Sequence, residues 1–297
     1  MAVSKDTIYE KFLAPFVNTF LIDREAMETF SRSIDWETQS DRLTNPNLVY
    51  PEYYTSQNFH GIEGGYMTVS AAVTYDPITQ YALPPNETWI RESLIDAVRA
   101  KPRRILDLGC GTGSMTIMLK RAFPQAEVIG LDLSPYMLTC AKTKTAGLDI
   151  GWRHGNAEEA EFPDASFDLV TAALLFHETP PTVSRKILEE SFRLLTTGGQ
   201  IIILDGNQKT LRQNNWLTEI FEEPYINSYA MGNIDAWLGA AGFGAVETQE
   251  VWWVHQISSA VKPFPNEDPD LISHHHHRGR QDVSFSGNNG ESFPAPA

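Results

Sequence analysis

Residues Ile105-Leu-Asp-Leu-Gly-Cys-Gly-Thr-Gly113 join a short apolar run to a turn rich in glycine. The next residues, Ser114 to Phe123, place apolar side chains at helical spacing, so the segment predicts a strand, a turn and a helix. Glycines in such a turn allow positive φ angles and a close approach of the backbone to a ligand. Free N–H groups at the helix start would point at that ligand. Alone, the pattern also fits a nicotinamide dinucleotide site.

Further apolar runs alternate with helical segments after this turn. We expect strands at 104–108, 128–132, 150–153, 167–173 and 199–204, and one or two more within 246–257, where Trp252 and Trp253 would lie. Apolar runs that do not alternate with polar residues indicate a parallel sheet covered on both faces. The predicted fold is therefore α/β, a doubly wound and mostly parallel Rossmann-like sheet of about seven strands. Ligands bind such sheets at the carboxyl ends of the strands.

The chain of 297 residues divides into three zones by composition. Residues 1–100 alternate helical stretches with irregular, aromatic-rich ones, and we expect them to form a lid over the substrate. Residues 101–261 should form the cofactor-binding core, with an insertion at about 208–230. Residues 262–297 carry few large apolar side chains and a run of four histidines at 274–277, and are expected to be a disordered tail.

Charge and cysteine content exclude several classes of function. The net charge of −15 would repel phosphate backbones and anionic lipids, so we expect no nucleic-acid partner. Two cysteines cannot build a disulfide framework, and no cluster has the spacing of metal ligands. No run approaches the ~20 apolar residues of a membrane span, and the first residues lack a signal-peptide layout. We expect a cytoplasmic monomer or homodimer that acts on a small molecule.

Four more features accompany the glycine turn. Asp107 precedes it, Asp132 ends the next strand, Gly155-Asn-Ala-Glu158 follows the third strand, and Leu194-Leu-Thr-Thr-Gly-Gly199 leads into the fifth. With these features, residues 100–258 resemble the class I S-adenosylmethionine-dependent methyltransferases, in particular the type 11 group that includes quinone-biosynthesis enzymes. The resemblance implies S-adenosylmethionine as cofactor and methylation of a small, partly apolar or aromatic metabolite on oxygen, nitrogen or carbon.

The resemblance also assigns cofactor-binding residues. Those expected to hold the methionine part are Asp107, Gly109, Cys110, Gly111, Gly113 and Ala173. Asp132 would accept hydrogen bonds from the ribose hydroxyls, and Leu133 would lie against adenine. Asn156 stands where the family usually has Asp and would accept from the adenine amino group, while Ala157 would offer its backbone N–H.

The residues that act on the acceptor have weaker signals. His177 and Glu178 follow the fourth strand, at the edge where the reactive methyl should point, and are the candidate catalytic residues; His177 has a near-neutral ordinary pKa suited to a base. The alternative is that His177 only lines the pocket or caps a loop. Candidate acceptor-binding residues are Tyr54, His60 and Tyr66 in the lid and Trp216 in the insertion. Two other readings stay open, a noncatalytic S-adenosylmethionine-binding regulatory or partner module and a nicotinamide-dependent oxidoreductase.

Overall fold

The computed structural model describes residues 23–59, 62, 64–82, 86–99, 101–221 and 223–265. His60 and the histidine run lie outside the described residues. Seven strands form one sheet: β1 (Arg104–Leu108), β2 (Glu127–Asp132), β3 (Gly151–His154), β4 (Phe167–Ala173), β5 (Leu195–Gly206), β6 (Gly244–Val251) and β7 (His255–Val261).

Helices precede the sheet, connect its strands and follow β5. Before β1 lie α2 (Arg24–Arg32), α3 (Trp36–Leu43), α4 (Glu52–Thr55), α5 (Val69–Ala82) and α6 (Glu87–Asp96). Between the parallel strands lie α7 (Ser114–Ala122), α8 (Pro135–Lys144), the 3₁₀ turn η2 (Phe176–Glu178) and α9 (Pro181–Leu194). After β5 come α10 (Gln208–Gln213), α11 (Asn215–Phe221), α12 (Ile226–Met231) and α13 (Ile234–Ala240).

The strand order, β3-β2-β1-β4-β5-β7-β6, confirms the predicted doubly wound sheet. Strands β1 to β5 pair in parallel, and β7 lies antiparallel between β5 and β6. Strand order reverses between β1 and β4, because β1 leads to β2 on one side while β4 leads to β5 on the other. The carboxyl ends of β1 and β4 therefore flank the crevice in which such sheets bind ligands.

Local sequence signals explain how the helices at this crevice begin. Gly113 caps α7 with a φ of +85°, a backbone conformation that favours glycine. Ser134 caps α8 by accepting a hydrogen bond from the Met137 N–H (3.2 Å), and Pro135 occupies the first helical turn. Asp168 has a structural role, since its carboxylate accepts from the backbone N–H groups of Arg103 (2.8 Å) and Arg104 (3.0 Å).

The end of the sheet differs from the sequence expectation. Trp252 and Trp253 do not belong to a strand but to the turn between β6 and β7, where both adopt positive φ angles (+49° and +61°) and both are more than half exposed. The apolar and aromatic residues of this stretch predict a strand. The chain instead reverses direction there, and β7 pairs antiparallel with β6.

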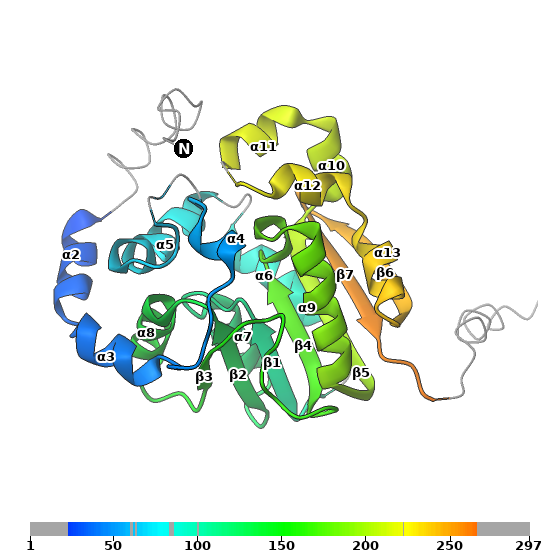
Figure 1. Ribbon diagram of the computed structural model, residues 1–297, viewed down its shortest axis with the longest axis horizontal. Coiled ribbons are helices and arrows are strands. Elements are labelled where there is room, and N and C mark those ends of the chain that lie inside the picture. Colours follow the sequence, from blue (N-terminus) through cyan, green and yellow to red (C-terminus); the bar gives the residue numbers. More distant parts are fainter. Residues whose placement is uncertain are drawn as a thin grey trace, which may run out of the picture.

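Two groups of helices rise above the carboxyl ends of the strands (Figure 1). Helices α4 and α5 stand on one side and the inserted helices α10 to α12 on the other. The two groups meet where the hydroxyl of Tyr225 donates to the backbone oxygen of Tyr53 (3.3 Å), with their rings edge to face. Among the described residues, no helix combines the length and the apolar character needed to cross a bilayer.

Gly130, in the middle of β2, tests how tightly the sheet packs behind the glycine turn. A Cβ at this position would lie 2.6 Å from the Trp152 ring and 2.8 Å from the Cys110 sulfur. We expect Gly130→Ala to lower the free energy of unfolding by about 1–3 kcal/mol through overpacking, measured by urea denaturation. The matched control is Gly239→Ala in α13, where a Cβ meets nothing within 4 Å and which should be neutral or slightly stabilising. Equal stability of both variants would contradict this account.

Candidate functional site

A cavity lies at the crevice between β1 and β4, beneath the two groups of helices. Its floor is made by the glycine turn and the ends of the strands, and its roof by aromatic side chains from the first hundred residues. The predicted residues that line it are Tyr54, Tyr66, Gly109, Gly111, Asp132, Leu133, Asn156, Ala157 and Glu178. Residues from five separate stretches of sequence thus meet at one edge of the sheet.

Asp132 is a buried carboxylate at the end of β2. Its Oδ2 accepts from the Gly111 N–H (2.8 Å) and its Oδ1 from the Ser134 N–H (2.8 Å). Each oxygen retains a lone pair that can accept from a ligand hydroxyl. Burial, only partly opposed by these two hydrogen bonds, raises the pKa of Asp132 to about 6. The arrangement suits a vicinal diol such as a ribose, which offers two hydroxyl donors.

Asp107, at the end of β1, faces a second, smaller cavity on the other side of the glycine turn. The hydroxyls of Thr116 (2.6 Å) and Thr171 (2.8 Å) donate to its two oxygens. Burial raises the pKa of Asp107 to about 6 against these hydrogen bonds. Cys110 and Ala173 line this second cavity together with Gly109. Gly113 lines neither cavity, and its lack of a side chain instead leaves room for the Trp152 ring.

One end of the main cavity lies over the ends of β2 and β3. Leu133 and the backbone of Gly155 to Ala157 supply apolar surface and amide groups there. The Asn156 side-chain oxygen already accepts from the Glu158 N–H (3.0 Å), which leaves it one lone pair for a ligand donor. Asn156 thus keeps one acceptor oxygen where the resemblance implies an Asp with two.

Hydrogen bonds of His154 hold the segment around Asn45 and Tyr50 at this end of the main cavity. Its Nδ1 accepts from the Asn45 N–H (2.8 Å), so Nε2 carries the proton and lies 2.9 Å from the Leu133 oxygen and 3.0 Å from the Tyr50 hydroxyl. Burial lowers the pKa of His154, consistent with a neutral ring. The segment before α4 is thereby held beside Leu133, at this end of the main cavity.

Aromatic side chains form the roof of the main cavity. Tyr54 and Tyr66 are joined there by Tyr53, Phe59 and Tyr75, which were not singled out from the sequence. Phe59 and Tyr66 stack with centroids 5.4 Å apart, and Tyr75 packs edge to face against Tyr66. Trp216, by contrast, is 47% exposed on α11 and is not among the lining residues. Its predicted contact with the acceptor has no geometric support in this arrangement.

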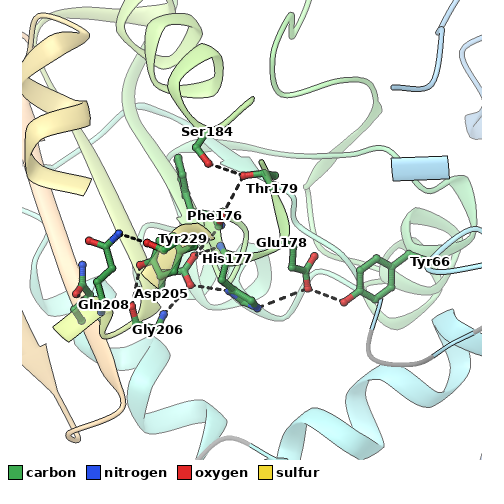
Figure 2. A network of polar contacts seen from close by, with 11 residues as sticks. Tyr66, Phe176, His177, Glu178, Thr179, Ser184, Asp205, Gly206, Gln208 and Tyr229 are labelled. Carbon is green, nitrogen blue, oxygen red and sulfur yellow. Dashed lines mark hydrogen bonds and ion pairs between the residues drawn. The ribbon is translucent and has the colours of Figure 1, made fainter. Parts of the chain in front are cut away.

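Figure 2 shows a chain of polar side chains running from β5 to the roof. Asp205, at the end of β5, accepts from His177 Nδ1 (2.7 Å) and from the Phe176 N–H (2.8 Å). His177 Nε2 lies 3.9 Å from a Glu178 oxygen, which accepts in turn from the Tyr66 hydroxyl (2.6 Å). Glu178 lines the main cavity, whereas His177 lies behind it.

The surroundings of His177 keep its ring protonated near neutral pH. Burial lowers the pKa of His177, but the charge and hydrogen bond of Asp205 and the charge of Glu178 outweigh it and raise this pKa to about 9. An imidazolium between two carboxylates is a poor base, which leaves Glu178 as the ionisable side chain of this pair in the cavity wall. Asp205 was missed from the sequence, although it ends a buried strand as Asp107 and Asp132 do.

Part of the chain is similar to known proteins. Residues 105–199 match the family described as "Methyltransferase domain". A demethylmenaquinone methyltransferase of Deinococcus radiodurans is 37% identical over 142 residues, which cover 47% of this chain and 58% of the relative. The protein of the same name from Thermus thermophilus is 39% identical over 119 residues, or 39% and 53% of the two chains. The chain thus spans little more than half the length of these curated relatives.

Solved structures share the fold. Human N-acetylserotonin methyltransferase in complex with S-adenosylmethionine superposes with a TM-score of 0.53 and 16% identity, covering 67% of this chain and 58% of that one. Phosphoethanolamine N-methyltransferase 2 of Haemonchus contortus, in complex with S-adenosyl-L-methionine, gives a TM-score of 0.52 at 16% identity and covers 74% and 62%. At this level of identity, the likeness concerns the fold alone.

The raised pKa of Asp132 makes cofactor affinity depend on pH. Ribose hydroxyls donate to the ionised carboxylate, so binding of S-adenosylhomocysteine should weaken as the pH falls through about 6. Asp107 titrates in the same range, so we expect the dissociation constant, measured by calorimetry, to rise by up to about 100-fold per pH unit below that value, about tenfold for each carboxyl. Asp132→Asn should bind more weakly at neutral pH, and its dissociation constant should rise by no more than about tenfold per pH unit, because only Asp107 then titrates. An unchanged slope in the variant would contradict the assignment.

The raised pKa of His177 stabilises the folded protein over a defined pH range. Because this pKa is about 9 in the folded chain against an ordinary 6.5, the stabilisation is fully present below about 6.5 and is lost as the pH rises through 9. The contribution is on the order of 3 kcal/mol. We expect the free energy of unfolding of the unmodified protein to fall more between pH 6.5 and pH 10 than that of His177→Gln. Parallel curves for the two proteins would refute this.

Proposed function

We propose that this chain, whose residues 105–199 belong to a class I S-adenosylmethionine-dependent methyltransferase domain, methylates a small aromatic acceptor that carries an acidic hydroxyl. One observation carries the proposal. The glycine turn with the strand ends and the aromatic roof line a single cavity, and the carboxylate of Glu178 lies in its wall. The demethylmenaquinone methyltransferase names of the relatives agree with an acceptor ring of the hydroquinone type.

The residues present fit S-adenosylmethionine, which supplies an already activated methyl group. Asp132 would hold the ribose, and Leu133, Asn156 and Ala157 would hold the adenine. Gly109 and Gly111 have φ angles of +60° and +52°, so their bare backbone can approach the methionine part. The aligned cofactor and acceptor need little further help, because positioning alone can supply roughly 7–11 kcal/mol of the barrier.

Glu178 takes the acceptor proton in this proposal. A phenolic hydroxyl against the aromatic roof would donate to the Glu178 carboxylate, and the oxygen or the activated ring carbon would then bond to the methyl group. The S–C bond would break with its electron pair remaining on sulfur, so the product S-adenosylhomocysteine would carry an uncharged sulfur. After attack by oxygen, the proton on Glu178 would pass to solvent; after attack by carbon, the phenolic oxygen would be reprotonated and the proton of the methylated ring carbon would be released instead. His177 and Asp205 position Glu178 from behind, and Tyr66 fixes it from the roof by its 2.6 Å hydrogen bond.

The competing function is a noncatalytic module that binds S-adenosylmethionine to regulate a partner. A carboxylate in the cavity wall, backed by an ion-pair network, favours proton transfer over simple binding, because burying such a network for no chemical purpose is unfavourable. Release of S-adenosylhomocysteine from S-adenosylmethionine, with phenols and reduced 1,4-naphthoquinone as acceptor probes, separates the two functions. Binding of S-adenosylhomocysteine without release on any probe would overturn the proposed acceptor class. Tight binding of NAD instead would overturn the cofactor.

Glu178→Gln tests the proton acceptor directly. The amide keeps the shape and the hydrogen bond from Tyr66 but cannot take a proton at neutral pH. We expect kcat on the best acceptor probe to fall about 100- to 10,000-fold, while the dissociation constant of S-adenosylhomocysteine stays within a factor of a few.

Asp205→Asn is the companion variant, because it changes the network without touching the cavity. Loss of the Asp205 charge should lower the pKa of His177 and move the alkaline limb of the pH–rate profile from about 9 to lower pH. Full activity of Glu178→Gln, or an unmoved alkaline limb in Asp205→Asn, would remove these residues from the proton path.

A further inference from the structure

The second cavity, beside Asp107, contains a buried cation that the account above does not use. Arg91 of α6 lines it, and only 4% of this residue is exposed. The cavity lies against the glycine turn, with Gly109 common to both cavities, so it continues the cofactor floor toward the far side of β1. Charged side chains are seldom buried to this degree unless they are paired or bind a ligand.

The contacts of Arg91 leave part of its guanidinium available. Its Nε donates to Glu87 Oε1 (2.9 Å), and its Nη2 lies 2.8 Å from the same oxygen. Glu87 precedes Arg91 by one helical turn, and its other oxygen accepts from the Thr79 hydroxyl (3.4 Å). A guanidinium carries five N–H donors in a planar fork, so a single carboxylate oxygen does not exhaust it.

The walls of this cavity suit a zwitterion. Arg91 supplies a positive charge on one side, and Asp107 supplies a carboxylate on the other. Ser114 and Met115, at the start of α7, add the positive end of a helix dipole to the lining. An amino acid group offers both a carboxylate and an ammonium, and each would meet the opposite charge here.

The structure places this cavity where the amino acid end of S-adenosylmethionine must lie. Asp132 and Leu133 set the nucleoside at one end of the glycine turn, and the second cavity opens at the other end. We propose that Arg91 binds the carboxylate of the methionine moiety, while Asp107 lies beside its ammonium group. The first hundred residues then contribute to the donor site as well as to the acceptor lid. This inference rests on the proposed cofactor and extends it to a specificity-determining residue.

A second contact of the same helical segment holds it against the glycine turn. The Thr112 hydroxyl donates to Asp76 of α5, and Asp76 also pairs with Lys144 of α8. Helix α5 is thus docked on the glycine turn, and α6 packs against α5 and against α7, the helix that follows the turn. Docking of α6 sets the position of the Arg91 guanidinium, so capture of the cofactor carboxylate depends on this segment.

The test is calorimetry with three ligands that differ only at the amino acid end. S-Adenosylhomocysteine has both charges, its decarboxylated analogue lacks the carboxylate, and 5′-methylthioadenosine lacks the whole group. We expect the unmodified protein to prefer S-adenosylhomocysteine to the decarboxylated analogue by about 10- to 100-fold, as for a charge-assisted hydrogen bond in a buried site. Arg91→Gln should lose most of that preference while its affinity for 5′-methylthioadenosine changes by less than about threefold.

Arg99→Gln is the matched control, since Arg99 follows the same helix but pairs with Glu247 at the surface, where both side chains are about half exposed. It should retain the full preference. Equal loss of affinity for all three ligands in Arg91→Gln would assign this arginine a structural role only. If Arg91→Gln does not fold, calorimetry on the unmodified protein still tests the inference. Equal affinity for S-adenosylhomocysteine and its decarboxylated analogue would overturn it. If no adenosine ligand binds the unmodified protein, the proposed cofactor itself fails.

Discussion

The carboxylate of Asp132 is the constraint on which the rest of the site depends. It accepts one backbone N–H from the glycine turn and one from the start of α8, and so fixes two loops that leave neighbouring strands. Ser134, whose N–H it holds, donates its hydroxyl to the backbone oxygen of Tyr66 (2.7 Å). One buried charge therefore positions the cofactor floor, the adjacent helix and the roof. Burial raises the pKa of Asp132, and two hydroxyl donors of a ligand would stabilise its ionised form.

The same edge of the sheet carries three buried aspartates with three different partners. Asp107 is held by threonine hydroxyls, Asp132 by backbone amides and Asp205 by a histidine. Because all three strands are parallel, their carboxyl ends bring the acids to one side of the molecule. These partners suit different roles. Neutral hydroxyls leave the charge of Asp107 available to an ammonium group, whereas the imidazolium of His177 neutralises Asp205, which would serve to position His177.

Local sequence signals predicted the parts of the site that lie on the sheet. Glycine φ angles, strand-ending acids and the Ser134-Pro135 cap depend on residues close in sequence, so the glycine turn, Asp132 and the mostly parallel sheet could be inferred. Asp205 was missed because the expected fifth strand ended at residue 204, whereas β5 extends to Gly206. Arg91 and the roof residues Tyr53 and Tyr75 could not be placed, since helical periodicity does not say which part of the sheet a preceding helix covers. The strand predicted at Trp252 and Trp253 was wrong. Aromatic residues favour strands, and their presence does not signal a turn with two positive φ angles.

The lid has consequences for the order of binding. Helices α4 to α6 contribute to the acceptor roof through Tyr54 and Tyr66 and to the second cavity through Arg91, so one segment contacts both ends of the reaction. A cofactor whose carboxylate pairs with Arg91 would favour the docked position of α6, and docking would preassemble the aromatic roof. Binding of the donor would then lower the free-energy cost of ordering the acceptor site, and by linkage the acceptor would tighten binding of the donor to the same extent. In this proposal, the charge of one arginine would couple the donor site to the acceptor site.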